Sequence, residues 1–563
     1  MNSETKACQN CKSNFQIEPE DFKFYEKMQV PAPTFCPECR MIRRMAWMGY
    51  RILYKRKCDF TGEEMITVHH QDIPQKVYKQ EVWWSDKWDP KDYGRDYDFS
   101  RSFFEQWLDL FRDVPLPALY TEYSSMINSE YCNAASTDRN CYLCFKCDGT
   151  EDSAYINTAV NLKNCFDVSY SFNTELSYES VNLTKCYRTF FSQDIEDSYD
   201  IWFSRDLMGC SNCIGSINLR NKNYHIFNDL YSKEEYEKLF LEYGFGSTRN
   251  ISEFRKKAED FMLKHPRKAF HGRKNINTTG DYIFNSKNVH DSYMVDGGEN
   301  AKYVQLVKFA PLAWCWDYTM FGMNAEWIYD STWVGINVSN IKFGFWNYNA
   351  HHLEYCFGCH GSGNLFGCVG IRKGEYCILN KQYSKEEYTQ LVEKIKKQMM
   401  EMPYKDDLKR EYKYGEYFPS EFGPWAYNES HAVEFFPLTK EEALEKGFLW
   451  RDFDPKEYSA ATAKVPDNIK DTEDSILSAI LKCENCGKNY QFAKMELDFH
   501  RKMNLPLPAE CPLCRDQARV KQLNPIKIFD RKCDKCGENI KTSYSPDRPE
   551  IVYCEECYLK EIV

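Results

Sequence analysis

Several features of exported and membrane proteins are missing from this sequence of 563 residues. It contains no apolar run approaching the ~18 residues that a membrane-spanning helix requires. Its first residues, MNSETKACQNC, lack the basic segment and following apolar stretch of a secretory signal. We therefore expect a cytoplasmic protein with no membrane partner, built from several domains.

The familiar catalytic motifs are missing too. The sequence has no P-loop, no GxSxG and no HExxH, and the glycine string from Gly361 to Gly367 does not have GxGxxG spacing, so no small-molecule substrate is identifiable. Positive charge is not in excess, because 73 Lys and Arg face 84 Asp and Glu, a net charge of −11. This balance excludes a surface coated in positive charge for nucleic acid, but it leaves room for a local basic patch.

Cysteine and aromatic residues, in contrast, are abundant, with 26 Cys and an aromatic content of 16%. Disulfide scaffolds are usually short, secreted chains, and this chain is long and carries no visible export signal. Metal ligands and buried thiols therefore account better for the cysteines.

The two ends of the chain are copies of one module. Two CxxC pairs separated by 24 residues begin at Cys8 and return, at the same intervals, from Cys483 onward. Each pair presents two thiolates to a tetrahedral ion, and two pairs complete a shell of four. The C-terminal copy adds a further set of two pairs, of which the N-terminal copy retains only Cys58. Reduced structural thiols or a redox CxxC are the alternative.

The spacing predicts three zinc ions as cofactors. Their predicted ligands are Cys8, Cys11, Cys36 and Cys39; Cys483, Cys486, Cys511 and Cys514; and Cys533, Cys536, Cys554 and Cys557.

Between the ends, aromatic residues recur at intervals close to 11 residues in two blocks. Short β-rich units of this period favour a β-solenoid, in which stacking of the rungs supplies the core. A repeated β-sandwich is the alternative. Both blocks close on the motif YSKEEY, where Ser232 and Ser384 are predicted N-caps of helices that cover the open ends.

The predicted fold class is mainly β with helical caps, an α+β multidomain chain of two β-solenoid-like repeat blocks flanked by treble-clef or zinc-ribbon modules. The predicted segments are an N-terminal zinc module (1–82), an aromatic and acidic docking segment (83–130), a first block (131–224), a helical cap and connector (225–280), a second block (281–382), a second cap with a docking segment at 450–458 and a linker (383–480), and a C-terminal double zinc module (481–563).

A basic stretch follows the N-terminal cysteines. Residues 40–57 carry seven cations and no acid, interleaved with Trp47, Tyr50 and Tyr54. Phosphates pair with such cations and bases stack on such rings, so the stretch is a candidate RNA-binding surface. A solvated face that balances the acidic remainder of the chain is the alternative. The candidate residues are Arg40, Arg43, Arg44, Arg51, Lys55, Arg56 and Lys57.

One cluster in the second block resembles a catalytic site. His351, His352 and His360 lie near Cys356, Cys359, Cys368 and Cys377 in the sequence. Imidazoles and thiolates can hold a metal with an open position or form a Cys–His nucleophilic pair. These cysteines also follow the repeat, which favours a ladder of buried thiols, as do Cys141, Cys144 and Cys147. We name no catalytic residue, and enzyme status stays open.

The CxxC pairs, the Phe-containing middle and the CPxCR motif of segments 8–44 and 483–519 resemble the zinc-ribbon or treble-clef family. Through CPECR, RILYKRKCDFTGE, EVWWSDKWDPKDYGRDYDFSR, GDYIFNSKNVHDSY and YCILNKQYSKEEY, the whole chain is similar to large, functionally uncharacterised zinc-ribbon proteins with Cys/Tyr-rich repeats from uncultivated bacteria with small genomes. The resemblance implies metal ligands rather than an activity.

We therefore predict a zinc-binding, non-catalytic interaction scaffold with a protein or RNA partner. Two alternatives stay open, namely an enzyme with a site at residues 351–360 and a structural component of a larger particle.

Overall fold

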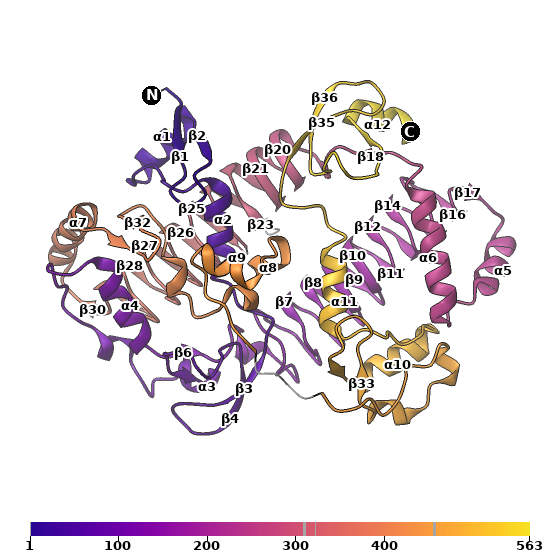
Figure 1. Ribbon diagram of the computed structural model, residues 1–563, viewed down its shortest axis with the longest axis horizontal. Coiled ribbons are helices and arrows are strands. Elements are labelled where there is room, and N and C mark those ends of the chain that lie inside the picture. The colour runs from indigo at the N-terminus through magenta and orange to yellow at the C-terminus, as the bar shows by residue number, and fades with distance from the viewer. Residues whose placement is uncertain (1, 308–310, 321, 454–457, 563) are drawn as a thin grey trace. The chain divides into compact units, whose positions relative to one another are not determined.

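The computed structural model describes residues 2–307, 311–320, 322–453 and 458–562. The described part is mostly strand, arranged in several sheets, with twelve α-helices (Figure 1). The chain divides into two compact units, each built from two separate stretches of sequence. The first unit comprises Met1–Leu119 and Phe270–Asp452, and the second comprises Tyr120–Ala269 and Phe453–Val563. Each unit therefore joins one end of the chain to the repeat block that is more distant from it in sequence.

Parallel strands form the long sheet of each repeat block. In the second unit these strands are β7 (Phe145–Asp148), β8 (Asn157–Lys163), β9 (Phe166–Glu175), β10 (Tyr178–Thr184), β11 (Tyr187–Phe190), β12 (Gln193–Glu196), β13 (Tyr199–Trp202), β14 (Arg205–Met208), β15 (Ser211–Ile214) and β16 (Asn223–Ile226), closed by the antiparallel β17 (Asp229–Leu230). In the first unit they are β19 (Gly272–Arg273), β20 (Ile276–Phe284), β21 (Lys287–Asp296), β22 (Gly298–Lys302), β23 (Gln305–Val307), β24 (Leu312–Trp316), β25 (Met323–Tyr329), β26 (Ile336–Lys342), β27 (Ala350–Glu354), β28 (Gly363–Phe366) and β29 (Glu375–Ile378), closed by the antiparallel β30 (Lys381–Gln382).

The strand register of the first block is twelve residues, as in Tyr178↔Phe190 and Gln193↔Arg205. The aromatic spacing of about 11 residues underestimates it, because the aromatic residues of successive strands are not always partners in the register. Tyr142, for example, is the partner of Ala154, whereas the next aromatic residue of the series is Tyr155. In the second block the register varies, from eleven residues at Ile276↔Lys287 to fourteen at Gly298↔Leu312.

A three-residue pattern underlies the twelve-residue register. Left-handed φ angles recur at every third residue, as at Asn161, Asn164 and Asp167. Asn and Asp tolerate this conformation better than most residues, which explains how often they occur at these bends. At every third position from Ser129 to Leu219 the residue is Ser, Thr, Cys, Ala, Val, Ile or Leu, with Asp138 the one exception. The apolar members of this set form a continuous buried core.

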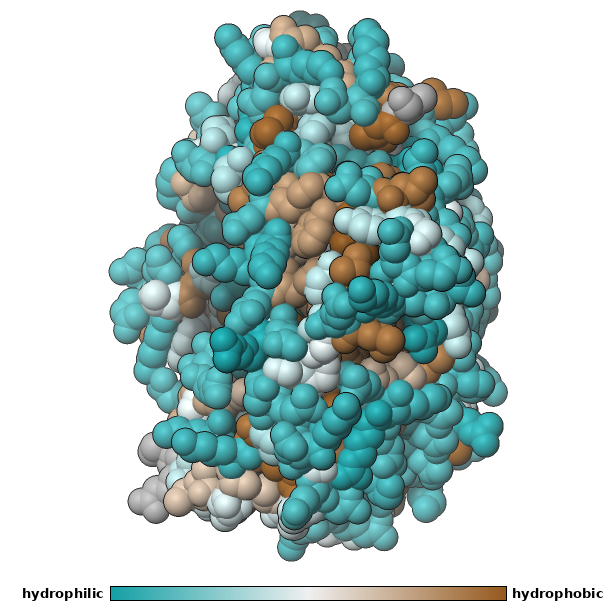
Figure 2. Space-filling view, turned by 90° about the vertical axis from the view of Figure 1, so that its right-hand side faces the viewer, coloured by the Kyte–Doolittle hydropathy of each residue, from teal (hydrophilic) through white to brown (hydrophobic). Residues whose placement is uncertain are grey.

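Helices follow the last strands of both blocks, as predicted. Ser232 and Ser384 are confirmed as N-caps of α5 (Lys233–Tyr243) and α7 (Lys385–Glu401), and each accepts a hydrogen bond from a backbone N–H three residues on. α5 packs on β16 and α7 packs on β29. On the side of the molecule that carries α5 and α6 (Thr248–Met262), apolar side chains gather in a strip between hydrophilic ones (Figure 2). Leu230 and Leu241 are the most exposed large apolar side chains there.

The aromatic segment that begins at residue 83 packs on the second block within the first unit. The Trp83 ring lies 5.5 Å from the Trp346 ring. The Trp107 indole N–H, on α4 (Phe103–Asp113), donates a 3.0 Å hydrogen bond to the Tyr355 carbonyl. Part of the second predicted docking segment, residues 454–457, lies outside the described residues.

Other described elements of the first unit are β1 (Glu4–Ala7), β2 (Asn14–Ile17), α1 (Pro19–Lys27), α2 (Pro37–Ala46), β3 (Tyr54–Lys57), β4 (Glu64–Thr67), β5 (Val77–Tyr78), α3 (Gln80–Trp83), β6 (Leu116–Pro117), β31 (Tyr404–Lys405), β32 (Glu411–Tyr412), α8 (Ala432–Phe435) and α9 (Lys440–Glu445). Those of the second unit are β18 (Arg267–Lys268), β33 (Leu481–Lys482), β34 (Asn489–Tyr490), α10 (Lys494–Met503), α11 (Pro512–Val520), β35 (Phe529–Lys532), β36 (Asn539–Thr542), β37 (Val552–Tyr553) and α12 (Glu555–Ile562). Among the described residues, no helix is long and apolar enough to cross a membrane.

Candidate metal centres

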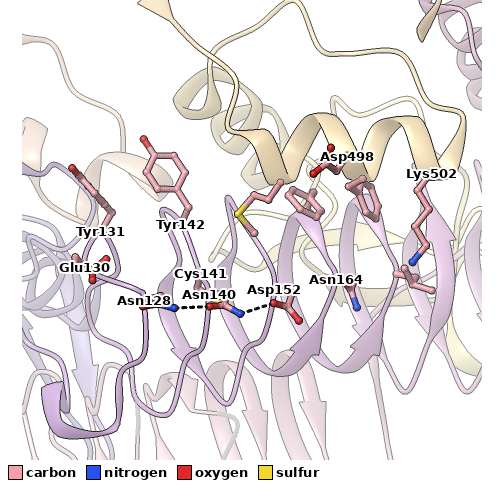
Figure 3. Close-up of a pocket in the computed structure, with 14 residues that line it drawn as sticks. Asn128, Glu130, Tyr131, Asn140, Cys141, Tyr142, Asp152, Asn164, Asp498 and Lys502 are labelled. Carbon is pink, nitrogen blue, oxygen red and sulfur yellow. Dashed lines mark hydrogen bonds between the residues drawn. The ribbon is translucent and has the colours of Figure 1, made fainter. Parts of the chain in front are cut away.

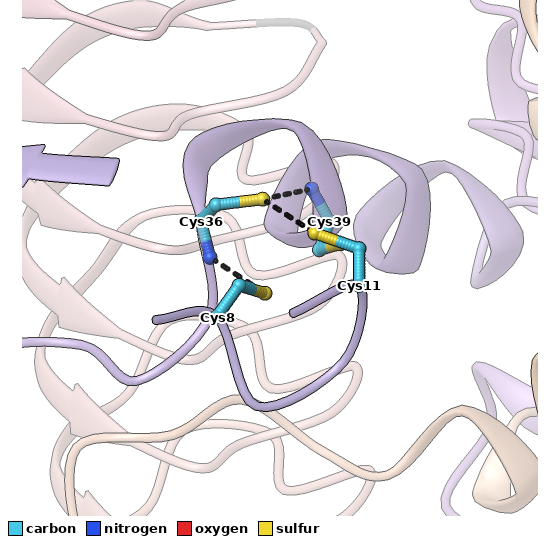
Figure 4. A group of neighbouring side chains, drawn as sticks. All are labelled: Cys8, Cys11, Cys36 and Cys39. Carbon is cyan, nitrogen blue, oxygen red and sulfur yellow. Dashed lines mark hydrogen bonds between the residues drawn. The ribbon is translucent and has the colours of Figure 1, made fainter. Parts of the chain in front are cut away.

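Three groups of four cysteines can each hold a metal ion, because the four sulfur atoms of a group lie within 4.8 Å of one another. They are the first cysteine group (Cys8, Cys11, Cys36, Cys39; Figure 4), the second (Cys483, Cys486, Cys511, Cys514) and the third (Cys533, Cys536, Cys554, Cys557). The structure thus brings together the twelve cysteines that the sequence predicts as zinc ligands, in the predicted groups of four, and their binding of zinc stays a prediction.

Sulfur spacing in these groups fits a tetrahedral ion. The Sγ atoms of Cys11 and Cys36 are 3.7 Å apart, and those of Cys536 and Cys554 are 3.8 Å apart. Four thiolates at a zinc–sulfur distance of about 2.3 Å would lie about 3.8 Å from one another. The residues present therefore fit an ion of this size without rearrangement of the backbone.

All three groups are built from the same two elements. The first CxxC pair of each lies in the loop of a short antiparallel hairpin: β1–β2, β33–β34 or β35–β36. The second pair lies at the start of a helix: α2, α11 or α12. A helix N-terminus carries partial positive charge and unpaired N–H groups, and both favour the thiolate form that binds metal.

Backbone N–H groups also point at the first sulfur of each group. The N–H groups of Cys36, Cys511 and Cys554 each donate a 3.2 Å hydrogen bond to the Sγ of the first cysteine of their group. Burial alone would raise the pKa of Cys483 and Cys533. Backbone N–H donors outweigh burial and lower these two pKa values to about 7 and about 6. Deprotonation, which metal binding requires, is correspondingly easier.

The N-terminal copy of the third group has lost its ligands but kept its backbone. Thr61, Lys79 and Val82 replace three of the four cysteines, and Cys58 is buried. The Lys79 N–H still donates a 3.3 Å hydrogen bond to the Cys58 sulfur. One thiol without these partners cannot hold an ion, and the hairpin is held instead by contacts such as the Arg56–Asp59 and Lys79–Glu63 ion pairs.

The helix after the first cysteine group is fixed to the second block by buried ion pairs. Arg40 contacts the Asp317 carboxylate, and Arg43 and Arg44 both contact Asp330, with 2.7 Å from Arg43 Nη2 to Asp330 Oδ2. The three arginines are 1%, 2% and 0% exposed. Three of the seven candidate RNA-binding residues are therefore already paired with acids inside the unit.

The helix that follows the second cysteine group is fixed to the first block by ion pairs of the same kind. Arg515 and Arg519 of α11 each place an Nη1 atom 2.6 Å from the Asp167 carboxylate. The Arg519 Nε donates to Ser169 Oγ at 3.1 Å, as the Arg44 Nε donates to Thr319 Oγ1 at 2.8 Å. The two docking contacts are therefore duplicated together with the modules and the blocks.

The other basic candidates lie nearer the surface. Arg51 Nη1 is 3.0 Å from Glu434, and Arg56 Nη2 is 2.8 Å from Asp59. Lys55 and Lys57 are exposed on β3. Nucleic-acid contact through this stretch therefore depends on these outer residues.

The histidines and cysteines of the second block do not converge. His351 and His352 are exposed on β27, whereas Cys356, Cys359, Cys368 and Cys377 belong to the fully buried core. Burial raises the pKa of Cys356 and Cys368, and it lowers the pKa of His360, which packs against Trp346, to about 3. A nucleophilic pair needs a thiolate beside a basic imidazole. The described residues here form a buried thiol ladder, as do Cys141, Cys144 and Cys147 in the first block.

Comparison of the chain with known protein families and with curated proteins finds no match. Metal ligation is thus supported by the geometry of the chain itself. Sequence reasoning missed Asp167 and Asp317, the acids that receive the two helices. Both have left-handed φ angles, at bends where Asp is ordinary, so nothing in the sequence distinguishes them from the other Asp residues at bends.

Proposed function

We propose that this protein is a zinc-binding, non-catalytic interaction scaffold with three structural zinc ions. The observation that carries the proposal is the set of three four-cysteine groups whose sulfur atoms lie within 4.8 Å of one another. A shell of four thiolates leaves no open position for a substrate, which is typical of structural rather than catalytic zinc. Thiolate donors also favour zinc over hard cations such as magnesium or calcium.

In this proposal each end of the chain carries treble-clef or zinc-ribbon modules. A hairpin that supplies two ligands and a helix N-terminus that supplies the other two support this assignment. The metal holds the hairpin against the helix, and in the first two groups the helix then carries buried arginines to the Asp of a block. Modules of this size have too little core to fold alone, so metal binding supplies part of the folding free energy.

We further propose that the two blocks are β-solenoids. A parallel register of twelve residues and a left-handed bend at every third residue support a rung of four short sides. The interior residues from the four sides are small enough to pack against one another along the axis of the stack of rungs. Stacked rungs give long, rigid surfaces, and repeat proteins use such surfaces to bind partners.

Metal analysis of the purified chain tests the zinc assignment. We expect three equivalents of zinc by inductively coupled plasma mass spectrometry, and two after Cys486→Ser. Cys58→Ser is the matched control, because this thiol belongs to none of the three groups. Fewer than two equivalents in the wild-type chain, or an unchanged content in Cys486→Ser, would contradict the proposal.

RNA contact remains a narrower proposal, supported only by the exposed Lys55 and Lys57 on β3. Binding of structured RNA should fall, and its salt dependence should weaken, in a Lys55→Gln/Lys57→Gln variant. Lys532→Gln, at the equivalent exposed position of β35, is the control. Equal binding by all three proteins would remove RNA from the proposed partners.

A further inference from the structure

A groove of about 630 Å³ runs along the first block beside α10 (Figure 3). One side is a column of polar residues that lie twelve positions apart: Asn128, Asn140, Asp152 and Asn164. The other side is α10, and aromatic and aliphatic side chains lie between them. Further lining residues are Glu130, Tyr131, Cys141, Tyr142, Phe166, Leu176, Met495, Asp498, Phe499 and Lys502. All belong to the second unit.

The polar column has hydrogen-bonding capacity beyond its own ladder. Asn128 Nδ2 donates to Asn140 Oδ1 at 3.0 Å, and Asn140 Nδ2 donates to Asp152 Oδ1 at 2.9 Å. A side-chain amide has two N–H donors and an oxygen with two lone pairs, and the ladder takes one donor from Asn128 and one from Asn140. The column therefore offers both donors and acceptors to a ligand. Hydroxyl groups also donate and accept hydrogen bonds, so a ligand rich in hydroxyl groups would suit it.

Aromatic rings give the groove apolar faces beside the polar column. Tyr131 is 38% exposed, and its ring lies edge-to-face 5.4 Å from the half-buried ring of Tyr142. Flat apolar rings next to hydrogen-bonding groups match the two characters of a pyranose, which has a C–H face and a rim of hydroxyl groups.

Charge in the groove argues against an anionic ligand. Glu130, Asp152 and Asp498 contribute carboxylates, and Lys502 contributes the one ammonium among the lining residues. Asp498 is also paired with Lys494, at 2.7 Å. A phosphate-bearing ligand would meet net repulsion here, whereas a neutral ligand would not.

We propose that this groove binds a short linear chain of neutral sugars that lies along the stack of rungs. Neighbouring parallel strands are ~4.8 Å apart, close to the length of one sugar unit, so each rung can present one polar side chain to one unit. A sugar-binding site goes beyond the proposed scaffold function. It depends on the proposed function in one respect, because metal bound by the second cysteine group would hold α10 in place.

Calorimetric titration of the metal-loaded full chain with cellohexaose, maltohexaose and xylohexaose tests the proposal. We expect at least one hexasaccharide to bind, and Tyr131→Ala to weaken that binding about tenfold through loss of ring contact. Asn128→Gly, which removes the amide but tolerates the φ angle of 48°, should weaken it about threefold. Tyr199→Ala removes a 50% exposed ring elsewhere on the same block and should leave binding unchanged.

The metal content and the melting temperature of each variant are measured as well, so that failure of the sugar site can be distinguished from failure of the zinc-binding scaffold. No binding of any hexasaccharide at millimolar concentration by a chain that holds three zinc ions would overturn the sugar site alone. Binding that Tyr131→Ala leaves unchanged would overturn it as well. A lysine- and leucine-containing octapeptide serves as a further probe. If the peptide bound in a Tyr131-dependent way and the sugars did not, the groove would be a peptide site instead.

Discussion

Inside the first block, serine and cysteine occupy equivalent interior positions but satisfy different backbone groups. Ser153 Oγ donates to the Glu151 carbonyl and accepts from the Cys165 N–H one rung further on, at 3.0 Å. Cys165 Sγ donates weakly to the Lys163 carbonyl, at 3.4 Å. Serine thus supplies a good acceptor for a buried N–H, while cysteine mainly supplies apolar volume. The many cysteines outside the metal groups are explained by packing.

Asp138 is the one acidic residue in this row of interior positions, and it makes stability dependent on pH. Burial raises its pKa to about 7, while the Thr150 N–H, which donates to Oδ1 at 2.9 Å, opposes the shift. An unfolded Asp has a pKa near 3.9, so between about pH 4 and pH 7 the folded chain holds one more proton than the unfolded chain. The free energy of unfolding therefore falls as the pH rises through this range, by up to about 4 kcal/mol.

Asp138→Asn should remove this dependence. We expect the variant to melt at a higher temperature than wild type at pH 8 and at nearly the same temperature at pH 5, measured by circular dichroism. Asp229→Asn, at an exposed position in β17, is the control. An equal change in melting temperature at pH 5 and pH 8 would show that the Asp138 carboxyl is already ionised in the folded chain at pH 5.

Arg519 and Asp167 should be strongly coupled in stability. Arg519→Ala leaves the fully buried Asp167 carboxylate with fewer partners, which costs about 3–5 kcal/mol. Asp167→Asn in the Arg519→Ala background should recover part of this loss, because no uncompensated charge is then buried. A double-mutant cycle from urea unfolding measures the coupling. Additive losses would mean that the two groups do not act as a pair.

At the scale of secondary structure elements, we expect the helices that carry the second CxxC pairs to depend on metal. α2 has ten residues, and isolated helices of this length are marginal in water. Its N-cap is Cys36, itself a predicted ligand, so the ion and the helix start share one residue. Loss of the ion should therefore loosen the whole helix together with the arginines that it carries.

Cys39→Ser should release the ion of the first group only. We expect faster amide hydrogen exchange over α2 and unchanged protection of α11 and α12, measured by mass spectrometry on the full chain. Cys58→Ser should alter neither metal content nor α2 protection. Full protection of α2 in a Cys39→Ser chain that has lost one ion would show that packing on the block suffices to hold this helix.

For the whole molecule, each unit combines a block with modules from the opposite end of the chain. The ion pairs that join them cross 277 residues from Arg40 to Asp317 and 348 residues from Arg515 to Asp167. We expect the modules and the blocks to differ in what stabilises them, because bound metal would hold the modules and paired parallel strands hold the blocks.

Removal of metal should separate these two contributions. After chelation, limited proteolysis should cut first within residues 8–46 and 483–562, while the strands from β8 to β16 and from β25 to β29 resist. Mass spectrometry of the fragments at early times identifies the cut sites. Restoring zinc should restore protection, and a first cut inside either long sheet would contradict this order.

The metal groups could be predicted from the sequence alone, because CxxC spacing is local. Two residues between cysteines suffice to bring two thiolates to one ion, and the duplication identified which pairs belong together. Helix starts at Ser232 and Ser384 were equally predictable, since an N-cap depends on a hydrogen bond to a residue three positions on. The three-residue pattern was also present in the sequence, but the more conspicuous aromatic residues, spaced irregularly near 11, obscured it.

Only the tertiary structure decided whether the arginines of the basic stretch are buried or exposed. In the sequence, Arg40, Arg43 and Arg44 belong to a basic stretch that is compatible with a nucleic-acid surface. In the folded unit they lie in the interior against acids hundreds of residues away. Charge pairing over such a separation leaves no local pattern, because any buried acid at a bend can serve as the partner. Local spacing thus determined which cysteines come together in groups of four, and long-range packing determined which of the charges remain at the surface.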